Sequence, residues 1–219
     1  MKKTICVLII TTCIISFVNG QKIKYGINPK FNVANQVLRE PSEKSSSRYQ
    51  WNNLYTMGIS AFAEKQYFNH LNALLKLGYC RKGFIEPIQT LDIYNEQKNY
   101  SNKNTFDYLN LDITGKIHMN KANINPYLQV GFRTDFLLNK NIDNYYDNSN
   151  NMYSYQHYKR FDVGVLGAIG VEIRNTIWVD FEASTDILKP VRTEYLLVRN
   201  RLWSFNLGIN LNKILYPNS

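Results

Sequence analysis

The sequence predicts an all-β protein, an eight-stranded antiparallel up-and-down transmembrane β-barrel. Eight stretches alternate apolar with polar or charged residues, long polar connections alternate with short turns, and the chain opens with an apolar stretch typical of a secretory signal. Successive side chains of a strand point to opposite faces, so each alternating stretch has one apolar and one polar face. A membrane barrel turns the apolar faces toward lipid and the polar faces toward its lumen.

Residues 1–20 have the features of a signal peptide that is cleaved on export. Two lysines form a positive start, an apolar stretch covers residues 5–18, and Gly20 supplies a small residue at the cleavage point. A membrane-anchoring helix needs about 20 apolar residues, more than this stretch contains. Cleavage is therefore expected, and it leaves residues 21–219 as a single barrel domain.

The eight alternating stretches are the expected strands. The sixth shows the pattern best, because Phe161, Val163 and Val165 share one face while Asp162 and Glu172 occupy the other. The expected strands cover residues 22–33, 54–64, 70–82, 105–119, 124–138, 161–173, 177–187 and 203–212. The positions expected to face lipid include Leu111, Val130, Val163, Val179 and Ile209.

The connections between the strands support a barrel independently of the alternation. Short turns are expected around Lys65–Gln66, Asn120–Lys121 and Asn175. The other connections are polar and longer, over residues 34–53, 83–104, 139–158 and 189–194. Strict alternation places all the longer connections at one end of the barrel. Outer-membrane barrels have short periplasmic turns and long external loops, so the expected location is the outer membrane of a Gram-negative cell envelope.

Four segments in order resemble a known family. The segments are Leu74 to Gly83 (LLKLGYCRKG), Phe106 to Leu111 (FDYLNL), Asn125 to Gly131 (NPYLQVG) and Asp162 to Glu172. They resemble the third strand, the central hairpin and the sixth strand of the PorT-type outer-membrane β-barrel family. The resemblance covers nearly the whole mature chain. It implies an outer-membrane barrel and, because some relatives assist type IX secretion, a secretion-accessory role as one expectation.

Charged residues on the polar faces are the candidate site. We expect a lumen network of Lys76, Asp112, Lys116, Arg133, Asp135, Asp162, Glu172, Asp180 and Glu182. One interpretation is a path for ions or solutes. The other is a structural plug, because an eight-stranded lumen is just wide enough for side chains to fill and buried charges must be paired. We favour the plug.

Enzymatic and metal chemistry find little support in the sequence. A hydrolytic site needs a nucleophile, a base and an orienting group within reach of one another, and His70, His118 and His157 have no evident serine partner. The acidic residues and histidines show no metal-ligand spacing. Cys80 is the one cysteine after the signal, which excludes an internal disulfide. We therefore expect no catalytic, metal or cofactor-binding residues, and not an enzyme.

The expected partners lie at the surface. The connection over residues 139–158 is rich in tyrosine and asparagine, which together make adaptable contacts with sugars or proteins, although a simple solvated loop is the alternative. Its candidate contact residues are Tyr145, Tyr146, Tyr153 and Tyr155. The net charge of +9 follows no nucleic-acid-binding motif and suits contact with lipid phosphates of the outer membrane.

These observations predict a structural, surface-binding or secretion-accessory function, with a protein or glycan partner bound through the long external loops. Two alternatives remain open from the sequence. One is an enzyme that modifies outer-membrane lipids, because some small barrels act on such lipids. The other is a soluble secreted barrel that carries an apolar ligand, which would require the apolar faces to point inward.

Overall fold

The computed structural model describes residues 23–39, 48–91, 97–119, 123–142, 159–188, 191–192 and 197–215. Its eight long strands are β1 (Ile23–Arg39), β3 (Leu54–Gln66), β4 (Leu71–Leu91), β5 (Gln97–His118), β6 (Ile124–Asn141), β7 (Phe161–Ile173), β8 (Ile177–Asp186) and β10 (Leu197–Asn210). Two short strands, β2 (Arg48–Gln50) and β9 (Val191–Arg192), and the helix α2 (Leu211–Leu215) complete the described elements. The expected signal peptide and the four candidate loop tyrosines lie outside the described residues.

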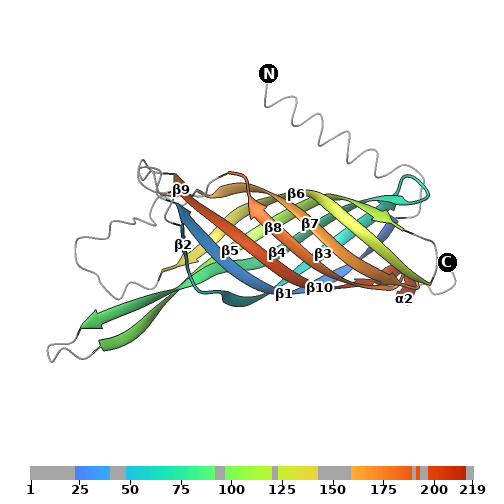
Figure 1. Cartoon of the computed structure of the whole chain (residues 1–219). Helices are drawn as coiled ribbons and strands as arrows, with labels where there is room; N and C mark the ends of the chain where they lie inside the picture. The colour runs from blue at the N-terminus through green and yellow to red at the C-terminus, as the bar shows by residue number, and fades with distance from the viewer. Residues whose placement is uncertain are drawn as a thin grey trace, which may run out of the picture.

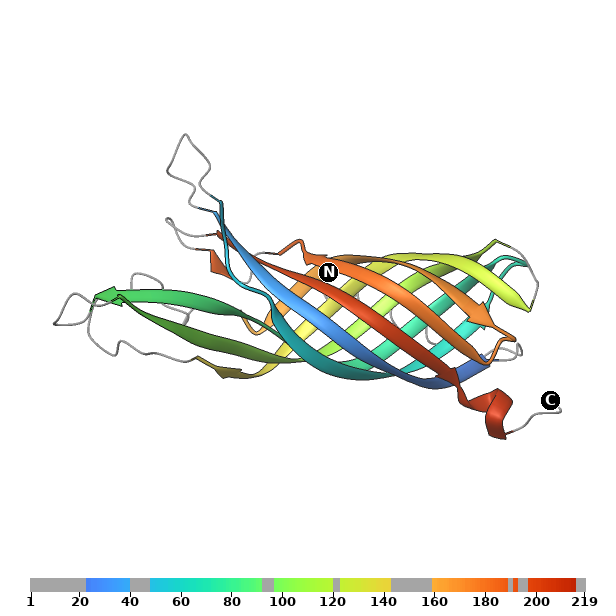
Figure 2. The ribbon, with the colours of Figure 1, turned by 60° about the horizontal axis from the view of Figure 1, so that its bottom comes forward.

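The long strands form one closed antiparallel barrel, as predicted. Each pairs with the next along the chain, and β1 pairs with β10 to close the sheet (Figures 1 and 2). Closure leaves the barrel without edge strands whose backbone groups would lack partners. No helix within the described residues is long and apolar enough to cross a membrane.

The side chains alternate between the two faces of the barrel wall. Val130 is 52% exposed and Val179 is 37% exposed on the outside, whereas Asp112 is completely buried inside. The other positions expected to face lipid, Leu111, Val163 and Ile209, are half-exposed on the same outer face. The predicted direction of the apolar faces is therefore confirmed, and it contradicts the soluble carrier, whose apolar faces would line the interior.

Strand ends differ from the prediction mainly on the side of the long connections. The strand β7 has the expected bounds, but β4 and β5 are 21 and 22 residues long and stay paired with each other as far as Leu91 and Gln97. The apolar outer face of β4 covers only residues 71–79, which agrees with the roughly 9–11 residues that a tilted strand needs to span a membrane. The outer ends of β4 and β5 project together from the barrel as an arm (Figure 1).

The opposite end of the barrel has tight turns. Between β7 and β8, Arg174 (φ 51°) and Asn175 (φ 57°) are both left-handed, and Thr176 N–H donates to Ile173 O at 3.0 Å. Two left-handed central residues give a turn whose twist matches that of the flanking strands. The turn between β3 and β4 lies over residues 67–70, slightly later than expected.

The closing seam between β1 and β10 ends in a side-chain contact. The last expected strand continues to residue 212, but β10 ends at Asn210 and α2 begins at Leu211. The Asn212 carboxamide accepts a hydrogen bond from Tyr25 N–H at 2.7 Å and donates one to Ile23 O at 3.1 Å. It thus occupies the backbone groups of β1 that a further residue of β10 would have paired.

Candidate functional site: the charged lumen

A central cluster of charges fills the middle of the barrel and consists of Lys30, Lys76, Asp112, Arg133 and Glu182. Arg133 holds it together, because its Nε and Nη2 each lie 2.7 Å from an oxygen of Asp112 while Nη2 also lies 2.6 Å from Glu182 Oε1. Lys30 Nζ is 3.4 Å from Asp112, and Lys76 Nζ is 3.4 Å from Glu182. The side chains are all buried and come from five different strands.

Asp180 lies beside the central cluster and is held by neutral donors. Tyr127 donates its hydroxyl to Asp180 at 2.7 Å, and the amide of Asn206, directly across on β10, also donates to it. With Asp180 included, three cations face three carboxylates in the middle of the lumen. This balance is what burial of charge requires.

A second cluster, the turn-side cluster, lies near the short turns and consists of Lys24, Glu64, Lys116, His118 and Glu172. Lys116 Nζ is 2.7 Å from Glu172 and 3.3 Å from Glu64, and Lys24 Nζ is 3.0 Å and 3.7 Å from the same two carboxylates. Glu64, His118 and Glu172 are close enough to hold a metal ion together. The two ammonium groups already balance both carboxylates, so ion pairing explains this cluster without a metal.

An aromatic layer separates the turn-side and central clusters. It consists of Phe62, Leu74, Tyr127 and Trp178, all buried inside the barrel. The rings of Phe62 and Trp178 meet edge to face with centroids 4.3 Å apart. Lys116 Nζ lies 4.3 Å from the Tyr127 ring centre and 4.5 Å from that of Trp178, so the layer also supports a buried cation.

Inward-facing glycines make room for these rings. A Cβ added at Gly208 would lie 1.9 Å from a Trp178 ring atom, and one at Gly26 would lie 2.6 Å from the Phe62 ring. Glycine at these positions lets a large ring press against the neighbouring backbone. The aromatic layer therefore depends on small residues in β1 and β10, far from the rings in sequence.

A third cluster, the outer cluster, lies toward the long connections and consists of Lys82, Asp135, Asp162 and Asp186. Lys82 Nζ is 2.6 Å from Asp135 and 3.4 Å from Asp186. Asp162 lies directly across from Asp135 on β7, and one of its oxygens accepts from Val163 N–H at 2.7 Å. Among the described residues, one ammonium group therefore faces three buried carboxylates here, so the outer cluster is not balanced.

Apolar side chains cover the lumen beyond the outer cluster. Ala34, Leu54 and Leu202 pack together with Ile85 against them. Phe84 and Phe106 are completely buried, and Trp51 stacks on Phe84 with ring centres 3.8 Å apart. We call these seven residues the apolar cap, since they close the end of the barrel from which the arm projects.

The structure places all nine expected network residues inside the barrel but divides them among the clusters. Three further lysines, Lys24, Lys30 and Lys82, lie in the clusters together with His118 and two further carboxylates, Glu64 and Asp186. The alternation signal already marks these positions, because they share the polar parity of their strands. His70 is different, since it lies exposed in the turn before β4.

Sequence comparison now decides the family. The outer membrane protein beta-barrel domain matches residues 19–187 of the chain. The chain belongs to this family. The barrel is therefore an outer-membrane barrel, with its apolar outer face in contact with lipid. No curated protein sequence matches this outer-membrane barrel.

Solved structures of similar shape are bacterial outer-membrane proteins. Ail of Yersinia pestis, in a complex with sucrose octasulfate, is 12% identical at a TM-score of 0.44, with 86% of this chain and 98% of that chain covered. Neisserial surface protein A is 12% identical at a TM-score of 0.43, with 87% and 99% covered. The enzyme PagL is 8% identical at a TM-score of 0.40, with 82% and 99% covered.

Proposed function

We propose that this outer-membrane barrel is a non-conducting scaffold of the PorT type that displays its external connections for binding. Structural, surface-binding and secretion-accessory roles all fall within this proposal. The observation that carries it is a lumen filled with side chains along its length. The charged clusters, the aromatic layer and the apolar cap follow one another from the short turns to the long connections.

The filling argues against a pore. An eight-stranded barrel has an interior just wide enough for side chains, and here Lys76, Asp112 and Lys116 are completely buried within it. Their partners are other lumen side chains at ion-pair distance. A solute would have to break these pairs and displace the apolar cap before it could pass.

The projecting arm supports a role in display. Beyond Thr105, where the pairing of β5 with β6 ends, β4 and β5 continue as a two-stranded ribbon that reaches Leu91 and Gln97. The tyrosine-rich connection between β6 and β7 leaves the same end of the barrel, since it follows Asn141 and precedes Phe161. Both features favour a protein or glycan partner on the external side.

The positions of His118 and His70, the two histidines in the described part of the chain, favour binding over lipid modification, while His157 lies outside the described residues. His118 lies in the lumen, where its Nε2 is 3.1 Å from the amide of Asn72. His70 lies in a turn at the end opposite to the long connections. A general base for outer-leaflet lipid would instead need to lie on the external side, within reach of the substrate.

Planar-bilayer recordings test the plugged lumen. Purified protein, whose folding is verified by a change in gel migration on heating, should insert without steady conductance. Large and steady channels from the folded wild-type protein would contradict the proposal and favour transport.

Labelling of intact cells tests the display. Tyr146→Cys places a thiol in the long connection, and Asn69→Cys places a matched thiol in the exposed turn between β3 and β4. The natural Cys80 is buried and should give little background. A membrane-impermeant maleimide should label Tyr146→Cys in intact cells and Asn69→Cys only after permeabilisation. The opposite pattern would place the long connections on the periplasmic side and contradict the proposal that they are displayed outside the cell.

A further inference from the structure

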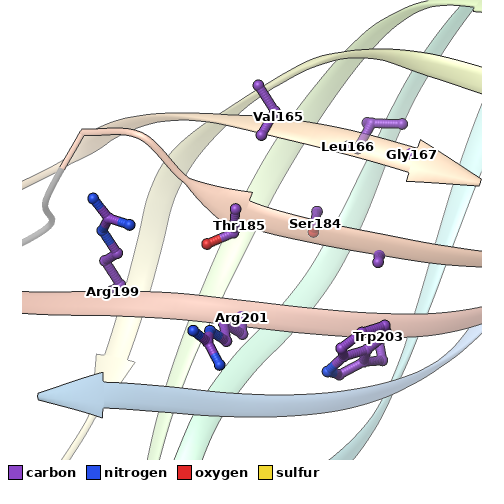
Figure 3. Close-up of a pocket in the computed structure, with 9 residues that line it drawn as sticks. Val165, Leu166, Gly167, Ser184, Thr185, Arg199, Arg201 and Trp203 are labelled. Carbon is purple, nitrogen blue, oxygen red and sulfur yellow. The ribbon is translucent and has the colours of Figure 1, made fainter. Parts of the chain in front are cut away.

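A shallow groove runs over the lipid-facing surface of β7, β8 and β10 (Figure 3). Small outward residues form its floor, because Gly167 and Ala183 lie across from each other and from Trp203 in the paired strands. Its volume is about 470 Å³. Its lining is more apolar than polar, as expected for a surface in contact with acyl chains.

Large apolar residues border the groove on the side of the membrane centre. Ile169, Phe181 and Phe205 are the outward residues next to Gly167, Ala183 and Trp203 in the same three strands, and each is at least 42% exposed. A depression between protruding side chains is a place where a single lipid chain can pack against the barrel wall. The groove is thus suited to one lipid in a fixed position.

Two arginines lie at the external end of the groove. The outward side chains of β10 are, in order from the external end, Arg199, Arg201, Trp203 and Phe205. Two charged side chains are therefore followed by an aromatic one at the boundary and then by apolar ones. Tryptophan favours the membrane interface, where one side is apolar and the other wet. Arg199 and Arg201 therefore lie at the height of lipid headgroups, on the side of the long connections.

These arginines differ from Arg81, an outward arginine of β4 toward the same end of the barrel. Arg81 on β4 is neutralised by Asp107, with its Nε 2.6 Å from Oδ1. Within the described part of the chain, neither Arg199 nor Arg201 has a carboxylate at ion-pair distance, and both are exposed. The described residues thus present two guanidinium groups toward the headgroup region without a carboxylate at ion-pair distance among them.

We propose that this groove binds one phosphorylated glycolipid of the outer leaflet, with an acyl chain over Gly167 and Ala183 and its headgroup phosphates on Arg199 and Arg201. Guanidinium groups bind phosphate oxygens through paired, charge-assisted hydrogen bonds. Residues two apart on a strand are separated by about 7 Å, so the pair suits a headgroup that carries more than one anionic group. This lipid site is independent of the proposed display function.

Native mass spectrometry of the full mature protein in detergent tests the site, with diphosphorylated lipid A as the probe. The wild type should retain one lipid A, and Arg199→Gln with Arg201→Gln should weaken that binding by about tenfold or more. A matched double variant, Arg160→Gln with Arg174→Gln, removes two exposed guanidinium groups away from the groove and should bind as the wild type does. Equal loss in both variants would overturn the site.

Further binding measurements distinguish between the possible occupants of the groove. Dephosphorylated lipid A should bind the wild type only as weakly as lipid A binds the double variant Arg199→Gln with Arg201→Gln. Equal affinity of the wild type for both lipids would overturn the role of phosphate. Displacement of lipid A by inorganic phosphate at equal concentration would identify an anion site and overturn the lipid assignment. A dimer that excludes lipid A would assign the groove to a second copy instead. Ala183→Phe fills the groove floor and should weaken binding with both arginines present.

Discussion

The central and outer clusters are both buried in the same lumen, yet their charges are arranged differently. In the central cluster Arg133 contacts Asp112 and Glu182 at 2.6–2.7 Å, and two lysines with the neighbouring Asp180 complete the balance of three cations and three carboxylates. In the outer cluster, as far as the described residues show, the one ammonium group of Lys82 faces three carboxylates. Pairing makes the first a stabilising plug, whereas excess negative charge makes the second a place where removal of a charge relieves repulsion.

The largest expected effect comes from breaking the central cluster. Arg133→Ala leaves two buried carboxylates without their main partner, and loss of one member of a buried pair costs about 3–5 kcal/mol. The free energy of unfolding, measured by denaturant titration in lipid vesicles, should fall by that amount without a gain in conductance. A loss below about 1 kcal/mol, the value of an exposed pair, would show that the cluster is solvated.

Removal of a charge from the outer cluster should act in the opposite direction. Asp162→Asn removes one of the three carboxylates that face a single ammonium group, and repulsion between buried charges several ångströms apart is on the order of 1–3 kcal/mol at an effective dielectric constant of about 20. Resistance to denaturant should therefore rise. The matched change Glu182→Gln, in the balanced cluster, should lower it, since Arg133 and Lys76 lose a partner. If both variants change the resistance to denaturant in the same direction, the proposed difference between the two clusters is wrong.

A change in the aromatic layer separates packing from charge. Gly208→Ala places a methyl group against Trp178 and should cost about 1–3 kcal/mol through overpacking. Gly115→Ala is the control, because its nearest added contact is Leu71 at 3.8 Å, and its effect should stay within about 0.5 kcal/mol. Thermal unfolding of both variants decides the matter, and similar stabilities would show that the barrel wall yields easily beside Trp178.

The smallest effect is expected at the exposed pair of Arg81 and Asp107. Partial burial raises the pKa of Asp107, but hydrogen bonds from Arg81 and Tyr79 outweigh it and hold the pKa below its usual value. A lowered folded-state pKa stabilises the protein above the unfolded-state pKa, and this contribution is lost as pH falls through the lowered value. Arg81→Gln should cost about 0.2–1 kcal/mol at neutral pH.

Acid titration of stability is the measurement for this pair. Wild type and Arg81→Gln should differ at neutral pH and converge once Asp107 is protonated. A difference that persists in acid would assign the effect to packing of the Arg81 side chain instead of its charge.

The sequence predicts the barrel well because a strand that slips by one residue exchanges its two faces. That constraint fixes the direction of Asp112, Arg133 and Glu172, and it gives the bounds of β7. The alternation of apolar and polar residues ends beyond the membrane, where lipid no longer selects apolar side chains. The sequence therefore does not predict the long arm of β4 and β5. The pair of Arg133 and Asp112 lies directly across two neighbouring strands, but the contact of Arg133 with Glu182 crosses the lumen, and strand order alone does not predict it.

The lumen aromatics were missed for a related reason. Alternation predicts polar residues on the inner face, and Phe62 and Trp178 are exceptions that fit only because Gly26 and Gly208 lie against them. Such complementarity joins residues 30 or more positions apart. It becomes visible only when the strands are placed in register.

The Asn212 contact at the closing seam has a consequence for how the chain folds. The hydrogen bonds of Asn212 join residues 187 and 189 positions apart, and the whole ladder between β1 and β10 spans nearly the full length of the barrel. Contacts of such long sequence separation form slowly, because a large loop must lose its entropy before they are made. The adjacent hairpins can zip up locally, and until the two ends meet, β1 and β10 remain open to pairing with other chains.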